Sequence, residues 1–222
     1  MPDENIYLFV PNIIGYARII LNLIAFYFMP TDHVIASVCY VVSALLDAVD
    51  GHAARSLNQG SKFGAMLDML TDRTGTMCLL VVLSHFYPAY MFWFQLSMTI
   101  DIVSHWLHLH TSIMKGSDSH KKIDLSANPI LRHYYSNRTI LFWMCAGNEG
   151  FYSALYLCYF TPGPVVPLGP LSFGLFTALA VVCFPVAVVK AGISLVQLYA
   201  ACENITAIDK TERAQQAAAK SQ

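Results

Sequence analysis

Charge is what this sequence has least of. Asp, Glu, Lys and Arg make up 12% of the 222 residues, while apolar residues make up 56%. A soluble domain usually carries about a quarter charged residues. The mean hydropathy of +0.50 agrees with this shortage. The composition therefore excludes an ordinary soluble globular protein and indicates an integral membrane protein.

Other features are missing as well. Six cysteines are scattered through apolar runs without a C-x-x-C pair, which excludes a zinc-ribbon or disulfide framework and favours small core residues. The net charge of −1 provides no basic field for nucleic acid. The first residues, Met1 to Glu4, are acidic where a cleavable signal peptide would be basic, so we expect no such peptide.

Apolar stretches long enough to cross a membrane as helices recur six times. They are Leu8–Phe28, Val34–Ala54, Phe63–Phe86, Tyr90–His110, Thr139–Phe160 and Leu171–Ala200. We therefore predict an all-α polytopic membrane protein with six transmembrane helices. It is expected to form a single domain over residues 1–222, with a polar tail from about residue 203. Pro185 within the last stretch predicts a kink or an exit along the surface.

The loop charges favour one orientation of these helices. Basic residues occupy the second and fourth connections and the tail: Arg55, Lys62, Lys115, Lys121, Lys122, Arg132, Arg138, Lys210, Arg213 and Lys220. All of them fall on one side of the membrane if both termini share that side. Because cytosolic loops carry the excess of Lys and Arg, we predict that both termini are cytosolic.

Four aspartates stand out against this scarcity of charge. Asp47 and Asp50 lie three residues apart in the second apolar stretch, and Asp68 and Asp72 lie four apart in the third. A carboxylate inside a membrane is costly, so four together predict both compensation and a function. Hard divalent cations suit clustered carboxylates, and four of these can hold two Mg²⁺ or Mn²⁺ ions. The cluster therefore favours metal-assisted chemistry on a phosphate-bearing substrate.

Helical periodicity places these groups on two stripes. Each stripe combines carboxylates with small residues: Asp47, Asp50, Gly51 and Ala54 on one helix, and Gly64, Asp68 and Asp72 on the next. The short turn from Leu57 to Lys62 predicts antiparallel neighbours with facing stripes. Small residues let a phosphate or a flat base approach the backbone, Arg55 offers a planar fork, and Ser61 offers a further donor. A carboxylate at the deep end can accept the proton of an incoming hydroxyl.

The same residues resemble a known family. The pattern D-x2-D-G-x2-A-R-x8-G-x3-D-x3-D, from Asp47 to Asp72, is similar to the complete signature of the class I CDP-alcohol phosphotransferases. The wider context at residues 11–18, 45–73, 104–110 and 119–121 is similar to the eukaryotic members that use myo-inositol as acceptor. The resemblance covers most of the chain and weakens after Gly163.

This resemblance implies specific roles. The metal ligands would be Asp47, Asp50, Asp68 and Asp72, and Asp72 would also be the general base. The head group of CDP-diacylglycerol would contact Gly51, Arg55 and Ser61, with Ala54 and Gly64 giving room. A myo-inositol hydroxyl would attack the phosphate next to diacylglycerol, forming phosphatidylinositol and releasing CMP. The resemblance further implies a six-helix core, a homodimer and an endoplasmic reticulum membrane protein whose active site faces the cytosol.

The sequence is compatible with other acceptors and with other roles for the aspartates. The signature binds the donor that all members share, so the acceptor would instead be glycerol phosphate, serine or choline in another member. A purely structural role would pair the aspartates with Arg55 and Arg73, but four acids outnumber two arginines. A divalent-cation carrier is the alternative outside this enzyme class, and it would not need Gly51, Ala54 and Gly64.

A second polar group lies in the fourth apolar stretch. Asp101, His105 and His108 recur on one helical face, so a zinc site is one interpretation. Hydrogen bonding within the bundle, or lining of a polar cavity, is the favoured one, and contact with inositol hydroxyls is a hypothesis. In the next connection, Lys121 and Arg132 either attract the anionic lipid substrate or simply follow the loop charge bias.

Two further charged residues lie inside apolar stretches. Arg18 in the first stretch either reaches a lipid phosphate or snorkels to the membrane surface. Glu149 in the fifth stretch has no partner evident from the sequence, and we expect it at a helix or dimer interface.

Overall fold

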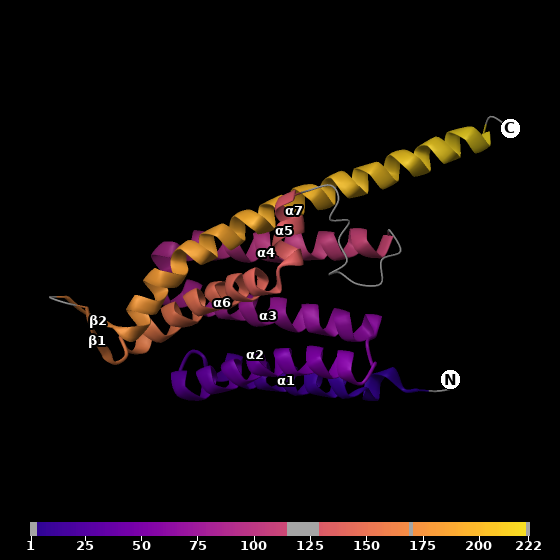
Figure 1. Ribbon diagram of the computed structural model, residues 1–222. Coiled ribbons are helices and arrows are strands. Elements are labelled where there is room, and N and C mark those ends of the chain that lie inside the picture. The colour runs from indigo at the N-terminus through magenta and orange to yellow at the C-terminus, as the bar shows by residue number, and fades with distance from the viewer. Residues whose placement is uncertain (1–3, 115–128, 169–170, 221–222) are drawn as a thin grey trace. The chain divides into compact units, whose positions relative to one another are not determined.

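A computed structural model describes residues 4–114, 129–168 and 171–220. Its elements in chain order are η1 (Ile6–Leu8), α1 (Val10–Phe28), α2 (His33–Ser56), α3 (Lys62–Phe86), η2 (Pro88–Tyr90), α4 (Met91–Met114), α5 (Pro129–Ser136), α6 (Arg138–Phe160), β1 (Val165–Leu168), β2 (Leu171–Gly174) and α7 (Leu175–Lys220). The first five predicted stretches each coincide closely with one long helix (Figure 1). The all-α prediction is thereby confirmed for the bulk of the described chain.

One short hairpin departs from the prediction. β1 pairs antiparallel with β2, with Val165 opposite Gly174. The sixth predicted stretch was therefore wrong at its start, because α7 begins at Leu175. Gly163 adopts a φ of +76° and Pro164 follows it, so the chain turns sharply here and cannot continue a helix.

Side-chain caps define the helices that carry the aspartates. Asp32 accepts hydrogen bonds from the backbone amides of Val34 (2.9 Å) and Ile35 (3.1 Å) at the start of α2. Ser61 accepts one from the amide of Gly64 (2.9 Å) at the start of α3. Such caps satisfy amides that have no partner inside the helix. Ser61 thus fixes the end of the predicted turn at which α3 begins, while Asp32 fixes the opposite end of α2.

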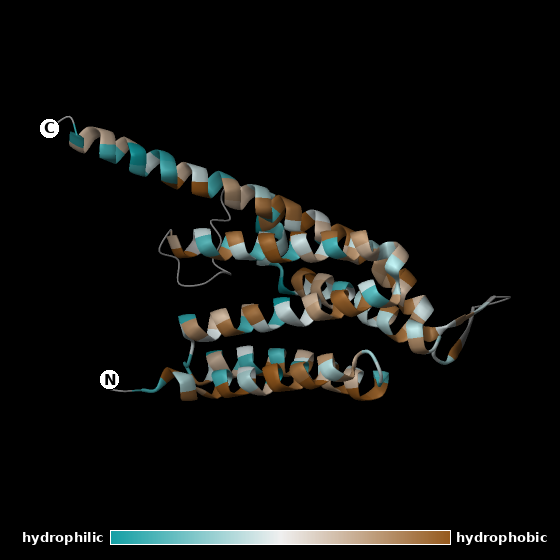
Figure 2. Ribbon diagram, turned by 180° about the vertical axis from the view of Figure 1, so that it is seen from behind, coloured by the Kyte–Doolittle hydropathy of each residue, from teal (hydrophilic) through white to brown (hydrophobic). Residues whose placement is uncertain are grey.

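Among the described residues, three helices are long and apolar enough to cross a membrane by length and composition: α1, α2 and α7. Along α7 the hydrophobic character is concentrated in the first part, and the end near the C-terminus is more hydrophilic (Figure 2). Pro185 lies inside this helix, which continues unbroken to Lys220. The polar tail is therefore helical.

The chain divides into two compact units. The first comprises Met1–Met98 and Ala146–Ala187, and the second comprises Thr99–Cys145 and Val188–Gln222. The core of the first unit is a buried apolar cluster: Ala25, Met29, Ala36, Leu79, Leu80, Leu83, Phe94, Tyr152 and Tyr156. The hydroxyl of Tyr156 donates to the carbonyl of Met29 at 2.9 Å, which ties α6 to the end of α1. All six cysteines are free thiols. Only Cys183 of the six is buried, and Cys145 and Cys202 are exposed, so the prediction of core positions was wrong for these two.

Candidate active site

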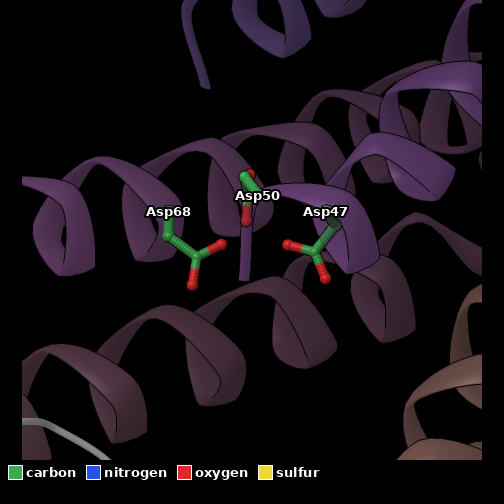
Figure 3. A group of neighbouring side chains, drawn as sticks. All are labelled: Asp47, Asp50 and Asp68. Atoms are coloured by element: carbon green, nitrogen blue, oxygen red, sulfur yellow. The ribbon is translucent and has the colours of Figure 1, made fainter. Parts of the chain in front are cut away.

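The four aspartates come from two helices of the first unit. Asp47 and Asp50 lie near the end of α2, and Asp68 and Asp72 lie in the first half of α3. α1 packs against both helices. In Figure 3 the carboxylates of Asp47, Asp50 and Asp68 converge on one small region. Ligand oxygens of these three side chains lie within 4.8 Å of one another.

The site is neither fully buried nor fully open. The side chain of Asp50 is 10% exposed and that of Asp68 is 23% exposed. Asp72 is 35% exposed and Asp47 is 44% exposed. Two carboxylates are thus well enclosed, while the other two remain accessible to a ligand.

Arg18 of α1 joins all four carboxylates. Its Nη1 lies 2.8 Å from Asp47 Oδ1 and 2.7 Å from Asp50 Oδ2. The same nitrogen lies 3.0 Å from Asp68 Oδ1, and Nη2 lies 2.5 Å from Asp72 Oδ1. The arginine side chain is only 3% exposed. It therefore neither snorkels nor reaches outward, and neither sequence-based interpretation of Arg18 describes this position.

The arginines do not balance the aspartates. Besides Arg18, Arg73 lies 3.8 Å from Asp72 through Nη2 and Oδ2. Arg55 is exposed, and its Nη1 would lie 3.4 Å from a Cβ added to Gly51. These two arginine charges face four carboxylates, so the ion pairs with Arg18 and Arg73 alone leave negative charge in a partly enclosed site, where charge is costly to bury. A divalent cation would neutralise this charge.

Two of the residues expected at the nucleotide have local structural roles. Ser61 is the N-cap of α3 and accepts from the Gly64 amide. A Cβ added to Gly64 would lie 2.7 Å from Asn12 Oδ1 and 3.1 Å from Ser61 Oγ. Asn12 is 1% exposed, and its amide nitrogen donates to the carbonyl of Ile6 at 2.5 Å. Gly64 therefore allows α1 to approach the first turn of α3 closely.

We expect Gly64→Ala to lower the stability of the protein by about 1–3 kcal/mol, the usual cost of forcing a methyl group into a filled site. Thermal unfolding in detergent measures this. Gly60→Ala is the matched control, because a Cβ there meets nothing within 4 Å. Equal stability of the two variants would contradict the close approach of Asn12.

We expect Ser61→Ala to cost about 1 kcal/mol through loss of the helix cap, and Ser61→Asp, which can still cap, to cost less. Unfolding midpoints measure the cap. A raised KM for CDP-diacylglycerol in both variants would reveal a separate substrate contact, whereas an unchanged KM would contradict the predicted role of Ser61 at the head group.

Glu149 of α6 has two partners in the first unit. The Tyr40 hydroxyl of α2 donates to Glu149 Oε2 at 2.8 Å, and the Thr76 hydroxyl of α3 donates to Glu149 Oε1 at 2.8 Å. Thr76 also lies one turn after Asp72 and 3.2 Å from its carbonyl oxygen. The predicted helix-interface position is thus the observed one, and this interface is next to the turn that carries Asp72.

The second polar group lies in the second unit. His105 Nδ1 is 2.8 Å from the Asp101 carbonyl oxygen and 3.5 Å from Asp101 Oδ1. Lys190 Nζ of α7 is 3.9 Å from Asp101 Oδ1. These contacts agree with hydrogen bonding within the bundle. Arg132 is exposed on α5, and Lys121 lies outside the described residues.

The third polar residue of that predicted helical face makes a different contact. His108 stacks on Tyr135 with ring centroids 6.4 Å apart, and the Tyr135 hydroxyl donates to Gln197 Oε1 at 3.0 Å. The interior of the second unit is therefore polar, with buried groups from α4 and α7. A role in binding inositol or lipid remains a prediction for these residues.

The site combines carboxylates from α2 and α3 with an arginine from α1, a helix long and apolar enough to span a membrane. These features are typical of an integral membrane protein with an acidic site suited to divalent cations. The family follows from comparison with known sequences. The family described as CDP-alcohol phosphatidyltransferase matches residues 8–135, which include Arg18 and all four aspartates, and the chain belongs to this family. The predicted family is confirmed. This family is metal-dependent, in agreement with the acidic cluster.

Curated relatives resemble nearly the whole chain. The human CDP-diacylglycerol–inositol 3-phosphatidyltransferase is 58% identical over 214 residues, which cover 96% of this chain and 99% of that protein. The enzyme of the same name from Drosophila melanogaster is 55% identical, covering 95% and 90%. The one from Schizosaccharomyces pombe is 43% identical, covering 95% and 94%. No solved structure gave a significant match.

Proposed function

We propose that this chain is an enzyme that transfers the phosphatidyl group from CDP-diacylglycerol to myo-inositol and releases CMP. The observation that carries the proposal is the convergence of four aspartates from α2 and α3 on the buried guanidinium of Arg18. Relatives of up to 58% identity over nearly the full length carry the name of this reaction. Catalytic geometry and acceptor identity thus have independent support.

The donor set fits two divalent ions. Carboxylate oxygens are the hard ligands that Mg²⁺ and Mn²⁺ prefer, and the cluster keeps an excess of negative charge after Arg18 and Arg73 are counted. We propose Asp47, Asp50, Asp68 and Asp72 as the ligands of two Mg²⁺ or Mn²⁺ ions. When bound, such ions neutralise a diphosphate and stabilise the charge that develops on the leaving CMP.

Asp72 is the proposed general base. Arg18 Nη2 lies 2.5 Å from its Oδ1, while its Oδ2 lies 3.8 Å from Arg73 Nη2. An inositol hydroxyl gives its proton to this carboxylate as its oxygen bonds to the phosphorus next to diacylglycerol. The bond between that phosphorus and the oxygen bridging to CMP breaks, and CMP leaves with the electron pair.

The head group of CDP-diacylglycerol is expected next to the stripe of small residues. Gly51 and Ala54 lie on the same side of α2 as the carboxylates, and the exposed Arg55 follows them by position. An exposed guanidinium at this position can form bidentate hydrogen bonds with phosphate oxygens. We propose that Ser61 and Gly64 border the same head-group site in addition to their structural roles.

The proposed membrane topology has six spans and cytosolic termini. In addition to the three apolar helices α1, α2 and α7, the helices α3, α4 and α6 have 25, 24 and 23 residues. About 20 residues suffice to cross a bilayer. We further propose a single catalytic domain over residues 1–222, because the family match runs through parts of both compact units. A homodimer in the endoplasmic reticulum membrane, with the site facing the cytosol, completes the proposal.

CMP release tests the function. Purified full-length protein would receive CDP-diacylglycerol, Mg²⁺ or Mn²⁺, and one of inositol, glycerol phosphate, serine or choline. We expect turnover with inositol alone. Turnover with another alcohol would keep the reaction class and replace the acceptor. No turnover with any alcohol and either ion, from folded protein and intact lipid, would contradict the enzyme and leave a cation carrier as the explanation of the carboxylates.

The polar group of the second unit has its own test. We propose that Asp101 and His105 contact inositol or lipid, with Lys121 and Arg132 contributing charge. His105→Ala would then raise the KM for inositol. An unchanged KM in a stable variant would contradict the proposal and leave a bundle-stabilising role.

A further inference from the structure

A single guanidinium contacts every proposed metal ligand. Nη1 of Arg18 lies within 3.0 Å of oxygens on Asp47, Asp50 and Asp68. Nη2 contacts Asp72. Four separate ion pairs to one side chain that is 3% exposed are far more than helix packing requires. The arginine supplies positive charge at the centre of the acidic cluster.

The contacted oxygens are also the donors that a divalent cation needs. A cation bound to them would be placed close to the charge of the guanidinium. Like charges a few ångströms apart repel strongly where water is partly excluded. The guanidinium of Arg18 and a divalent cation therefore compete for the same carboxylate oxygens.

The arginine side chain is not fully satisfied by its carboxylate contacts. Its Nε is buried and has no hydrogen-bond partner among the residues that the structure describes. A buried donor without an acceptor is unfavourable, so moving this side chain costs less free energy than moving one whose donors are all satisfied. The backbone is fixed more firmly, because the hydroxyl of Ser43 on α2 donates to the Arg18 carbonyl at 3.2 Å. The side chain can therefore move while α1 stays in place.

We propose that Arg18 is a tethered counter-cation of the metal centre. Its guanidinium holds the four carboxylates together before metal binds and is displaced when a divalent cation arrives. The inference rests on the proposed function for the presence of such a cation. It has two consequences: folding does not require metal, and the affinity for divalent cations is lower than the carboxylates alone would give.

Metal binding and stability, measured without lipid substrate or inositol, test this proposal. Full-length Arg18→Met, Arg18→Lys and the tail control Arg213→Met would be purified in detergent. Thermal unfolding would be followed in EDTA and in Mg²⁺, and Mn²⁺ binding by electron paramagnetic resonance. Arg213 is exposed in the polar part of α7, so its variant should match the wild type in all readings.

Arg18→Met is expected to unfold at least about 5 °C lower in EDTA. It should regain most of this loss in Mg²⁺, and it should bind Mn²⁺ about tenfold more tightly than the wild type. Arg18→Lys should be intermediate, because an ammonium keeps the charge but lacks the planar fork. Weaker or unchanged Mn²⁺ binding, or an equal loss of stability in EDTA and Mg²⁺, would overturn the proposal and leave Arg18 a structural residue.

A variant that fails to fold is also informative. Arg18→Met combined with Asp68→Asn removes one charge of each sign and should fold better in EDTA than Arg18→Met alone. No improvement would overturn the charge argument. A wrong acceptor alcohol would change the CMP assay and leave all of these readings unaltered, so the two proposals fail separately.

Discussion

Asp72→Asn is expected to lower the turnover of CDP-diacylglycerol by about 10²–10⁴-fold, the usual contribution of a general base. An amide cannot take up the proton of the inositol hydroxyl. Before a divalent cation binds, its carbonyl oxygen can still accept from Arg18 Nη2, which lies 2.5 Å from Asp72 Oδ1. The fold should therefore survive while the chemistry is lost. Initial rates of CMP release at saturating inositol and saturating Mn²⁺ measure the effect.

Two comparisons separate the base from a metal ligand. Asp68→Asn removes a proposed ligand without removing the base, so higher Mn²⁺ concentrations should restore part of its activity. The loss in Asp72→Asn should persist at every Mn²⁺ concentration. Asp209→Asn makes the same chemical change at an exposed position of the polar tail and should leave the rate unchanged. If Asp72→Asn kept more than a tenth of the wild-type rate, another group would have to be the base.

Local rules were sufficient to predict the helices that carry the aspartates. The apolar lengths predicted α1 to α4 and α6 closely, and the short turn before Lys62 predicted that α2 and α3 are consecutive helices with clustered acids. The spacing of Asp68 and Asp72 determines their common side, because residues four apart share a helical face. These are properties of contiguous segments, which a sequence reports directly.

Contacts between distant segments could not be predicted in the same way. Arg18 is 32 residues from Asp50 and 54 from Asp72 in the chain, and Glu149 is 109 residues from Tyr40. No periodicity relates such positions. The available signal was the shortage of charge. An arginine within an apolar stretch is expected to form an ion pair with acidic residues of other apolar stretches, when these acids outnumber the nearby basic residues. For Arg18, the aspartates are the acids that such a pairing indicates.

The hairpin before α7 has a different explanation. The apolar composition from Leu171 onward satisfied the length criterion for a membrane helix, although the residues up to Gly174 form β2. Hydropathy does not report backbone conformation, whereas Gly163, with a φ of +76°, lies where the chain leaves the helical conformation before β1. Gly and Pro clusters were therefore better guides to this boundary than apolar length.

Glu149→Ala is expected to lower the free energy of unfolding by about 1–3 kcal/mol. The substitution removes the carboxylate oxygen that accepts from the Tyr40 hydroxyl at 2.8 Å. The Thr76 hydroxyl, also 2.8 Å from Glu149, keeps the Asp72 carbonyl oxygen at 3.2 Å as an acceptor. Each unsatisfied buried donor costs about 1–3 kcal/mol. Glu149→Gln should cost less, since an amide keeps one acceptor oxygen. Thermal unfolding in detergent measures both.

Removal of the orphaned donor should partly rescue this loss. In the Glu149→Ala background, Tyr40→Phe is expected to be nearly neutral, because replacing both partners of a buried hydrogen bond leaves nothing unsatisfied. In the wild type the same Tyr40→Phe should destabilise by about 1 kcal/mol. Glu203→Ala is the matched control: this exposed side chain accepts from Tyr199 at 2.8 Å, one turn away on α7, and its loss should cost at most about 0.5 kcal/mol. Additive effects of Tyr40→Phe and Glu149→Ala would mean that the two side chains do not interact, and that α2 and α6 are joined next to the Asp72 turn by some other contact.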